Sequence, residues 1–244
     1  MFEELSHFRH EHKYIEPESS LIGIQSRLNA LMQKDTHVKA GNSYAIRSLY
    51  FDDYRDRFLN ESIDGVDERT KWRIRIYDRD ASFISLERKM RKADLISKQS
   101  CRIDVDTYKA LIKTEAAIST ANPPLLNLFI KEIKTSALHP AVIVEYDRTP
   151  FVAKSGNTRV TIDRNIRSSD ELDAFLSDGN LSSRPVLVSG QSLLEVKFDA
   201  FLPDHIAHAI EHGRMRRETF SKYYLARKFS CTGTASARYL RRIQ

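Results

Sequence analysis

Hydrophobic and polar residues alternate in several short stretches of the chain, and this period of two predicts β-strands. The clearest stretch is KWRIRIYD, residues 71–78. Its two faces differ chemically, because successive side chains of a strand point to opposite sides. One face holds Trp72, Ile74 and Ile76, and the other holds Lys71, Arg73, Arg75 and Tyr77. Similar alternation predicts strands around 9–15 and at 44–52, 70–78, 83–90, 95–104, 141–149, 159–165 and 192–199.

Stretches with helical spacing lie between these strands. A first helix is expected after Ser19 or Ser20, either of which can cap it. Further helices are predicted at 106–117 and 124–136, in a segment that Asp204 caps and Gly213 ends, and from Glu218 onward. About eight strands with interleaved helices and no repeat predict an α+β fold with a mainly antiparallel sheet. Residues 1–244 are expected to form one domain, and the pattern leaves open whether the sheet closes.

Composition narrows the class of protein. A hydrophobic content of 41% supports a sizeable core, while the net charge of +6 is too small to indicate a nucleic-acid binder. No two glycines have the spacing of a dinucleotide-binding or Walker A loop, so any phosphate must be held by side chains. Only Cys101 and Cys231 occur, and no leader or membrane span is evident, so we expect a cytoplasmic protein.

The charged residues recur on shared faces of five strands. In LLEVKF, residues 193–198, Glu195 and Lys197 alternate with apolar residues. On one strand this pattern is typical of a half-exposed sheet. Its repetition indicates that the charges face a common interior, where they would repel one another and be costly to desolvate. A polyanion there, bridged by a divalent cation on the carboxylates, would make the arrangement tolerable.

These stretches together resemble the vacuolar transporter chaperone (VTC) domain, the polyphosphate polymerase branch of the triphosphate tunnel metalloenzymes. The motifs follow the family's order from Arg9 to Arg227. They are RHEHKY, SLYFDD, KWRIRIYD, LERKM, ISKQS, VEYDRTPF, RVTIDRNI, LLEVKF and FSKYYLAR. The resemblance implies a closed eight-stranded antiparallel β-barrel, or tunnel, with helices packed on its outside.

The resemblance also implies an activity, the transfer of the ATP γ-phosphoryl group onto inorganic polyphosphate with Mn²⁺ or Mg²⁺. Glu195 matches a metal-binding glutamate, Tyr146 matches a tyrosine before a wall arginine, and Ser221 and Lys222 match the start of the closing helix. The basic positions that match phosphate-holding residues are Lys13, Arg73, Arg75, Lys89, Lys98, Arg148 and Arg159.

Phosphoryl transfer needs in-line positioning and charge neutralisation, which arginine forks and lysine point charges supply. We expect the arginines to orient the phosphate chain and the lysines to neutralise it. The expected catalytic set is Arg73, Arg75, Lys89, Arg148, Arg159 and Lys222. The expected substrate-binding set is Lys13, Lys98, Tyr146, Ser221 and Lys197.

The first strand departs from the wider superfamily. An ExExK motif binds metal there in tunnel triphosphatases, whereas Arg9 replaces its first carboxylate here, followed by Glu11 and Lys13. This departure disfavours a two-metal triphosphatase. It leaves Glu11, Glu87 and Asp163 as candidate metal ligands beside Glu195.

Other functions remain as alternatives. A triphosphate hydrolase and a non-catalytic polyphosphate-binding module fit the same tunnel. An RNA-binding protein would explain the basic segment 216–229 but not the alternating carboxylates, so no nucleic-acid partner is expected. The HAIEH stretch, 208–212, matches a zinc-protease pattern but lacks a suitable third ligand. Any membrane association would need a partner protein.

Overall fold

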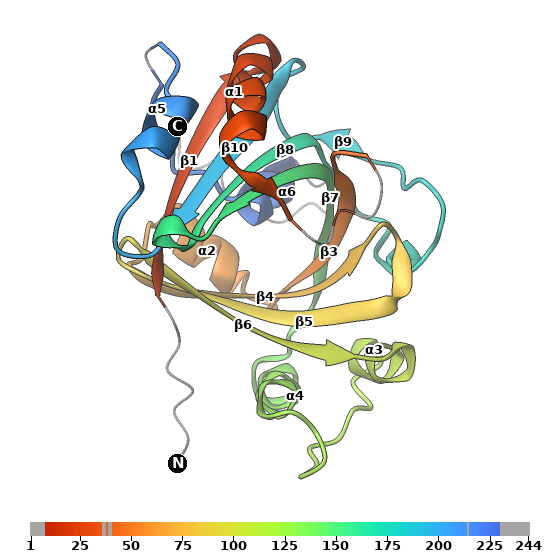
Figure 1. Ribbon diagram of the computed structural model, residues 1–244. Coiled ribbons are helices and arrows are strands. Elements are labelled where there is room, and N and C mark those ends of the chain that lie inside the picture. The colour runs from red at the N-terminus through yellow and green to blue at the C-terminus, as the bar shows by residue number, and fades with distance from the viewer. Residues whose placement is uncertain (1–7, 36–37, 39–40, 214, 230–244) are drawn as a thin grey trace, which may run out of the picture.

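The computed structural model describes residues 8–35, 38, 41–213 and 215–229. Within them, ten strands form one antiparallel sheet, and eight close into a ring in the order β7-β3-β4-β5-β6-β1-β10-β8 (Figure 1). The ring closes because β7 pairs with both β3 and β8. The strands are β1 (Arg9–Pro17), β2 (Gln33–Lys34), β3 (Tyr44–Asp52), β4 (Glu68–Tyr77), β5 (Asp80–Lys92), β6 (Leu95–Ile103), β7 (His139–Ala153), β8 (Thr158–Ser169), β9 (Arg184–Pro185) and β10 (Gln191–Phe198).

The helices lie outside the ring, as expected for this fold class (Figure 1). They are α1 (Glu18–Leu31), α2 (Arg57–Ile63), α3 (Val105–Ile112), α4 (Pro124–Ser136), α5 (Asp204–Ile210) and α6 (Lys222–Phe229), with short 3₁₀ turns at Ser155–Asn157 and Leu172–Ala174. Helices α1 and α5 pack on one side of the ring, and α3 and α4 pack on the other side, against β5 and β6. Within the described residues, no helix has the length and apolar character that a membrane span needs.

The outer face of β4 explains why helices cover the ring. Trp72, Ile74 and Ile76 are fully buried there. The Trp72 ring lies 4.8 Å from that of Phe129 on α4, and its indole N–H donates to Glu132 at 3.0 Å. Apolar side chains on this face therefore anchor the helix layer, and the predicted division of the strand into two buried faces is confirmed.

A second hydrophobic core holds α1 and α5 on the other side. Leu21, Ile24 and Leu28 of α1 pack with the outward residues Leu194 and Val196 of β10, and all five are fully buried. The predicted apolar face of LLEVKF thus packs outward. Its charged face points into the interior of the ring.

Several predicted helix boundaries were wrong. Helix α1 begins at Glu18 and has no side-chain cap, so neither predicted serine caps it. Pro203 occupies the N-cap of α5, which places Asp204 inside the first turn, and this helix ends at Ile210. Helix α3 ends at Ile112 rather than at 117, and α6 begins at Lys222 rather than at Glu218. Helix α2 lies in a segment for which no element was predicted.

Within the described ranges, the pair β1 and β6 has the fewest paired residues of the ring, Arg9 with Ile96 and His10 with Leu95. Segment 218–221 runs beside this seam. The Glu218 N–H donates to the Lys13 carbonyl at 2.8 Å, and the Lys13 ammonium donates to the Phe220 carbonyl at 2.8 Å. The residues before α6 therefore supply backbone partners where the strands diverge.

Candidate functional site

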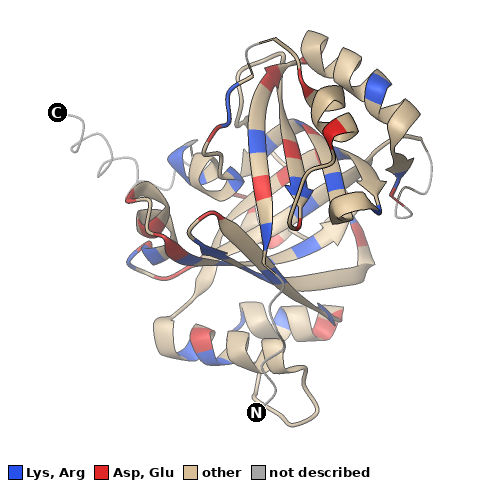
Figure 2. Cartoon of the chain, turned by 60° about the vertical axis from the view of Figure 1, so that its left-hand side comes forward, with Lys and Arg blue, Asp and Glu red and all other residues tan. Residues whose placement is uncertain are grey.

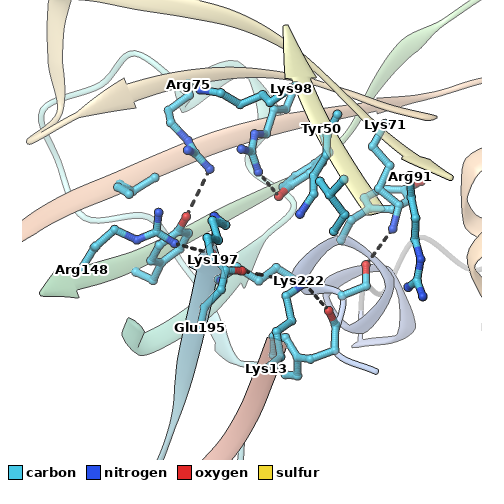
Figure 3. A pocket seen from close by; sticks show the side chains of 18 of the residues that line it. Lys13, Tyr50, Lys71, Arg75, Arg91, Lys98, Arg148, Glu195, Lys197 and Lys222 are labelled. Carbon is cyan, nitrogen blue, oxygen red and sulfur yellow. Dashed lines mark hydrogen bonds and ion pairs between the residues drawn. The ribbon is translucent and has the colours of Figure 1, made fainter. Parts of the chain in front are cut away.

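The inward faces of the ring line one pocket, which the start of α6 covers (Figure 3). Among the described residues, thirteen Lys and Arg side chains line it, whereas Glu195 is the one carboxylate. Figure 2 shows basic and acidic positions close together on these strands. The structure brings twelve predicted site residues to this pocket: Lys13, Arg73, Arg75, Lys89, Lys98, Tyr146, Arg148, Arg159, Glu195, Lys197, Ser221 and Lys222.

The other two predicted site residues, Glu11 and Glu87, lie behind this lining. Their side chains are each 1% exposed, because lysine and arginine side chains cover them. Asp163, also named as a candidate ligand, is fully buried in a similar position. Asp35 and Asp94 pair with two further lining cations, Arg159 and Arg91, so with Glu195 six carboxylates contact members of the set of thirteen lining cations, and the wall keeps a positive excess.

Glu11 is surrounded by three lysines. The ammonium groups of Lys13 and Lys89 each lie 2.8 Å from its Oε1, and that of Lys197 lies 3.6 Å from its Oε2. Burial and repulsion from Glu195 would raise the pKa of Glu11, but the three lysines hold it well below the usual range. Glu11 is therefore ionised and fixes the lysines of this wall.

Glu87 has the same role on the opposite side. Arg73 donates to its Oε2 through Nε at 2.7 Å, and the ammonium of Lys98 donates to its Oε1 at 2.9 Å. The Arg75 guanidinium lies 3.6 Å away. Burial would raise the pKa of Glu87, but these three cations hold it well below its usual value. Both carboxylate oxygens are thus committed to cations.

Arg148 and Lys222 share Asp163. The guanidinium of Arg148 makes two hydrogen bonds of 2.7 Å to the two carboxylate oxygens, a fork-like geometry that fixes its plane. The Lys222 ammonium lies 2.7 Å from Oδ2. Because Lys222 is the first residue of α6, this ion pair joins the helix to the far wall of the ring.

Glu195 faces the lumen and has three cations around it. Lys197 lies 2.5 Å from its Oε1, while Arg148 and Lys13 lie at 3.7 and 3.8 Å. Burial would raise the pKa of Glu195, but the surrounding cations lower it well below the usual range. Burial lowers the pKa of Lys197 to about 7 in spite of Glu195 and Glu11. This lysine titrates near neutral pH.

Tyrosines orient two of the arginines. The Arg75 guanidinium donates to the Ser48 hydroxyl at 3.0 Å and to the Tyr146 hydroxyl at 3.1 Å. Arg159 donates to the Tyr44 hydroxyl at 3.1 Å and pairs with Asp35 at 2.7 Å. These contacts fix guanidinium planes before any ligand is present, which favours binding of a planar array of oxygens.

A buried cluster outside the pocket holds α6 in place. Asp52 accepts backbone N–H groups of Phe58 and Leu59 at 2.9 and 3.0 Å, and it also accepts the Tyr223 hydroxyl. Arg227 lies 2.6 Å from Asp56. The SLYFDD motif therefore docks α6, and with it Ser221 and Lys222, against the pocket.

Some lining residues were absent from the predicted site. They are Arg9, Arg69, Lys71, Arg91, Tyr44, Tyr50, Tyr77, Ile46, Ile96, Phe220 and Tyr223. Strand parity was the available signal for Arg69 and Lys71, because they share the inward face of β4 with Arg73 and Arg75. Tyr50 is recognised as a lining residue from the structure, where its hydroxyl accepts a hydrogen bond from Arg73 at 3.1 Å.

The donor set fits a divalent cation that phosphate would help to hold. Within the described part of the chain, no three His, Cys, Asp or Glu side chains form a metal-binding group on their own. Mg²⁺ and Mn²⁺ prefer oxygen ligands, and Mg²⁺ often combines one or two carboxylates with substrate phosphates. Glu195 lines the pocket, and its charge acts on the neighbouring Glu11. The HAIEH stretch does not form an alternative zinc site, because His208 and His212 are exposed.

Comparison with known proteins gives a family and a fold. The model of the family described as the VTC domain matches residues 8–230. A Hippeastrum protein, described as having a dominant triphosphatase activity, is similar in structure with a TM-score of 0.54 and 11% identity, covering 93% of this chain and 97% of that chain. No curated protein matches the chain.

Two other solved structures are similar at lower scores. The Mimivirus capping-enzyme triphosphatase has a TM-score of 0.39 and 12% identity, covering 84% of this chain and 87% of that chain. A Pyrococcus horikoshii protein has a TM-score of 0.41 and 9% identity, covering 83% and 85%. The predicted family and the predicted ring-shaped fold are confirmed by the family match and the Hippeastrum structure.

Proposed function

The chain belongs to the VTC domain family, and we propose from this premise that it is an ATP-dependent polyphosphate polymerase. In the proposed reaction, a terminal oxygen of polyphosphate attacks the γ-phosphorus of ATP. The bond from γ-phosphorus to the bridging oxygen breaks, and its electron pair leaves with ADP. The observation that carries the proposal is the lumen lined by thirteen basic side chains and, among the described residues, by one carboxylate, Glu195.

The pocket residues match the needs of this reaction. Phosphoryl transfer is catalysed mainly by positioning and by neutralising charge on phosphate oxygens. Arg73, Arg75 and Arg148 are held rigidly by their partners and would orient the phosphates. Arg159, held by Tyr44 and Asp35, would orient them as well, and Lys89, Lys98 and Lys222 would neutralise charge. Lys13, Lys98, Lys197, Tyr146 and Ser221 would bind the chain.

We propose Glu195 as the principal ligand of a Mn²⁺ or Mg²⁺ cofactor, with Glu11 beside it. When bound, the ion would neutralise phosphate charge and draw the phosphate oxygens together. Glu195 lines the lumen, whereas the side chains of Glu11 and Glu87 lie behind the lining, which supports this order. Glu87 also stays in the proposed set, although both its oxygens contact cations.

A triphosphate hydrolase is the second candidate. The Hippeastrum protein is described as having a dominant triphosphatase activity, and its fold is similar. Water rather than a phosphate chain would then be the acceptor in the same lumen. A non-catalytic module that binds polyphosphate is a third candidate, because the same positive charge of the lumen would suit it. We propose that residues 1–244 act as one cytoplasmic unit on ATP and polyphosphate, without a nucleic-acid partner, and that a partner protein would supply any contact with a membrane.

A product assay separates the candidates. Purified protein is incubated with ATP and Mn²⁺, and polyphosphate, ADP and free phosphate are measured together. The polymerase predicts polymer and ADP in step, with little free phosphate. Free phosphate without polymer would support the hydrolase, and no turnover with retained polyphosphate binding would support the binding module. Arg75→Ala should abolish polymer formation, while Lys131→Ala, an exposed change on α4, should not.

A further inference from the structure

Inward residues of β4 and β5 face each other in rows along the lumen. The register pairs Arg69 with Arg91, Lys71 with Lys89, Arg73 with Glu87 and Arg75 with Ser85. The first two rows thus place a cation opposite a cation, and a carboxylate enters only at the third. Like charges directly opposite each other on a sheet are destabilising. In these two rows Arg91 lies 3.4 Å from Asp94 and Lys89 lies 2.8 Å from Glu11, whereas Arg69 has no carboxylate within 4.0 Å among the described residues.

Lys71 differs from every other lysine that lines the lumen. Lys13, Lys89, Lys98, Lys197 and Lys222 each lie within 4.0 Å of a carboxylate. Lys71 has no such carboxylate among the residues that the structure describes. Its ammonium donates to the Ser221 hydroxyl at 2.8 Å and lies 5.5 Å from the centre of the Tyr223 ring (Figure 3).

The surroundings of Lys71 disfavour its charge in the free protein. Burial lowers its pKa well below the usual value, and Arg69, Lys13 and Lys89 lower it further, against a weaker opposing effect of Asp52. A cation in such a place reduces stability unless an anion joins it. Residues that reduce stability in this way are characteristic of binding sites.

The spacing of the rows determines how long a phosphate chain must be to reach Lys71 and Arg69. Rows on one face of a strand are two residues apart, so the four rows span about 20 Å. An extended triphosphate, with two bridging oxygens, is much shorter than this. A condensed phosphate that fills the inner rows must therefore contain more than three phosphoryl groups to reach Lys71 and Arg69.

We propose that Lys71, Arg69, Arg91 and the Ser221 hydroxyl form a further phosphate subsite at this mouth of the lumen, which binds condensed phosphate beyond the length of a triphosphate. The proposal rests on the proposed function, since it needs a phosphate chain in the lumen. Ser221 accepts a hydrogen bond from Lys71 and can donate its own proton to a phosphate oxygen. Lys71 supplies a charge that has no carboxylate within 4.0 Å in the described part of the chain.

Binding of two probes tests the subsite. Dissociation constants for inorganic triphosphate and for long-chain polyphosphate are measured by calorimetry with EDTA at fixed salt. Lys71→Met should weaken long-chain binding about tenfold and triphosphate binding less than about threefold. Lys71→Arg should keep long-chain binding within about threefold of wild type. Lys131→Met on α4, with the same loss of charge, is the matched control and should bind both as wild type.

Thermal unfolding without phosphate separates a binding role from a structural one. Lys71→Met should unfold at the wild-type temperature or above it, because no carboxylate loses a partner. Unchanged long-chain affinity, equal losses for both probes, or a lowered unfolding temperature would each overturn the subsite. A wild-type protein that binds neither probe would instead overturn the proposed function itself.

Discussion

The two ends of the row pattern on β4 show different ways of keeping charges in one lumen. In the inner section, Arg73 lies 2.6 Å from Glu87, whose side chain is 1% exposed. In the mouth section, Arg69 faces Arg91, and Lys71 faces Lys89. The inner cations are oriented by protein carboxylates before a ligand arrives. At the mouth, Lys89 and Arg91 also lie near carboxylates, Glu11 and Asp94, whereas Lys71 has none within 4.0 Å among the described residues, so a bound anion would supply its counter-charge.

This difference separates stability from binding. Removing one member of a buried ion pair leaves the other uncompensated, which is strongly destabilising. Removing a buried cation that lacks a carboxylate partner relieves repulsion instead. Substitutions in the inner section should therefore affect folding and binding together, whereas substitution of Lys71 at the mouth should affect binding alone.

The largest effect is expected for Arg148→Met in the inner section. It leaves the fully buried Asp163 without its two 2.7 Å hydrogen bonds. The free energy of unfolding should fall by about 3–5 kcal/mol. Urea denaturation measures this change, with Lys71→Met as the comparison variant. If the two variants were equally stable, the contrast between the inner section and the mouth would be wrong.

The next effect concerns two carboxylates. Glu195→Gln should lower polymer formation on the order of 100-fold and raise the Mn²⁺ concentration required, because a charged ligand facing the lumen is lost. Glu87→Gln should reduce stability and leave the Mn²⁺ requirement near that of wild type. Titration of activity with Mn²⁺ compares them. Equal shifts in both variants would assign the metal to Glu87 as much as to Glu195.

The smallest effect is a pH dependence of binding. Lys197 has a pKa of about 7, so it is largely neutral at pH 8. A bound phosphate chain favours its charged form and raises this pKa, so binding at pH 8 should take up on the order of one proton, and affinity should fall as pH rises through 7 to 8. At pH 5.5 the lysine is already charged and uptake through it should vanish.

Calorimetry in two buffers of different ionisation enthalpy measures the uptake. Lys197→Met is the control and should take up fewer protons at pH 8. Lys71, whose pKa is also lowered, should account for part of what remains. Equal uptake in wild type and Lys197→Met would show that Lys197 does not change its charge on binding.

Strand parity predicted much of the lumen. The alternation in KWRIRIYD and LLEVKF correctly separated inward charges from outward core residues, since every second residue of a strand shares a face. The same rule identifies Lys71 and Arg69, which lie two and four residues before Arg73. The number of strands alone did not predict that the sheet closes into a ring. The family resemblance supplied that prediction.

Contacts between distant segments could not be predicted. Arg47 is 1% exposed and donates to the carbonyls of Phe175, Ser177 and Gly179, in a segment with no regular pattern. Helix α2 was missed because its polar sequence is ordered by backbone hydrogen bonds to Asp52. Glu87 lies behind the lining because Arg73 and Lys98 cover its carboxylate. Strand parity does not predict which cations do so.

The central claim is that condensed phosphate occupies the lumen with a divalent ion on Glu195. A crystal structure of the protein with inorganic triphosphate and Mn²⁺ tests it most directly, because the anomalous signal of manganese locates the ion. We predict manganese bound to the Glu195 carboxylate and phosphate oxygens in contact with Arg73, Arg75 and Arg148. Triphosphate outside the ring, or manganese away from both Glu195 and Glu11, would contradict the proposed site.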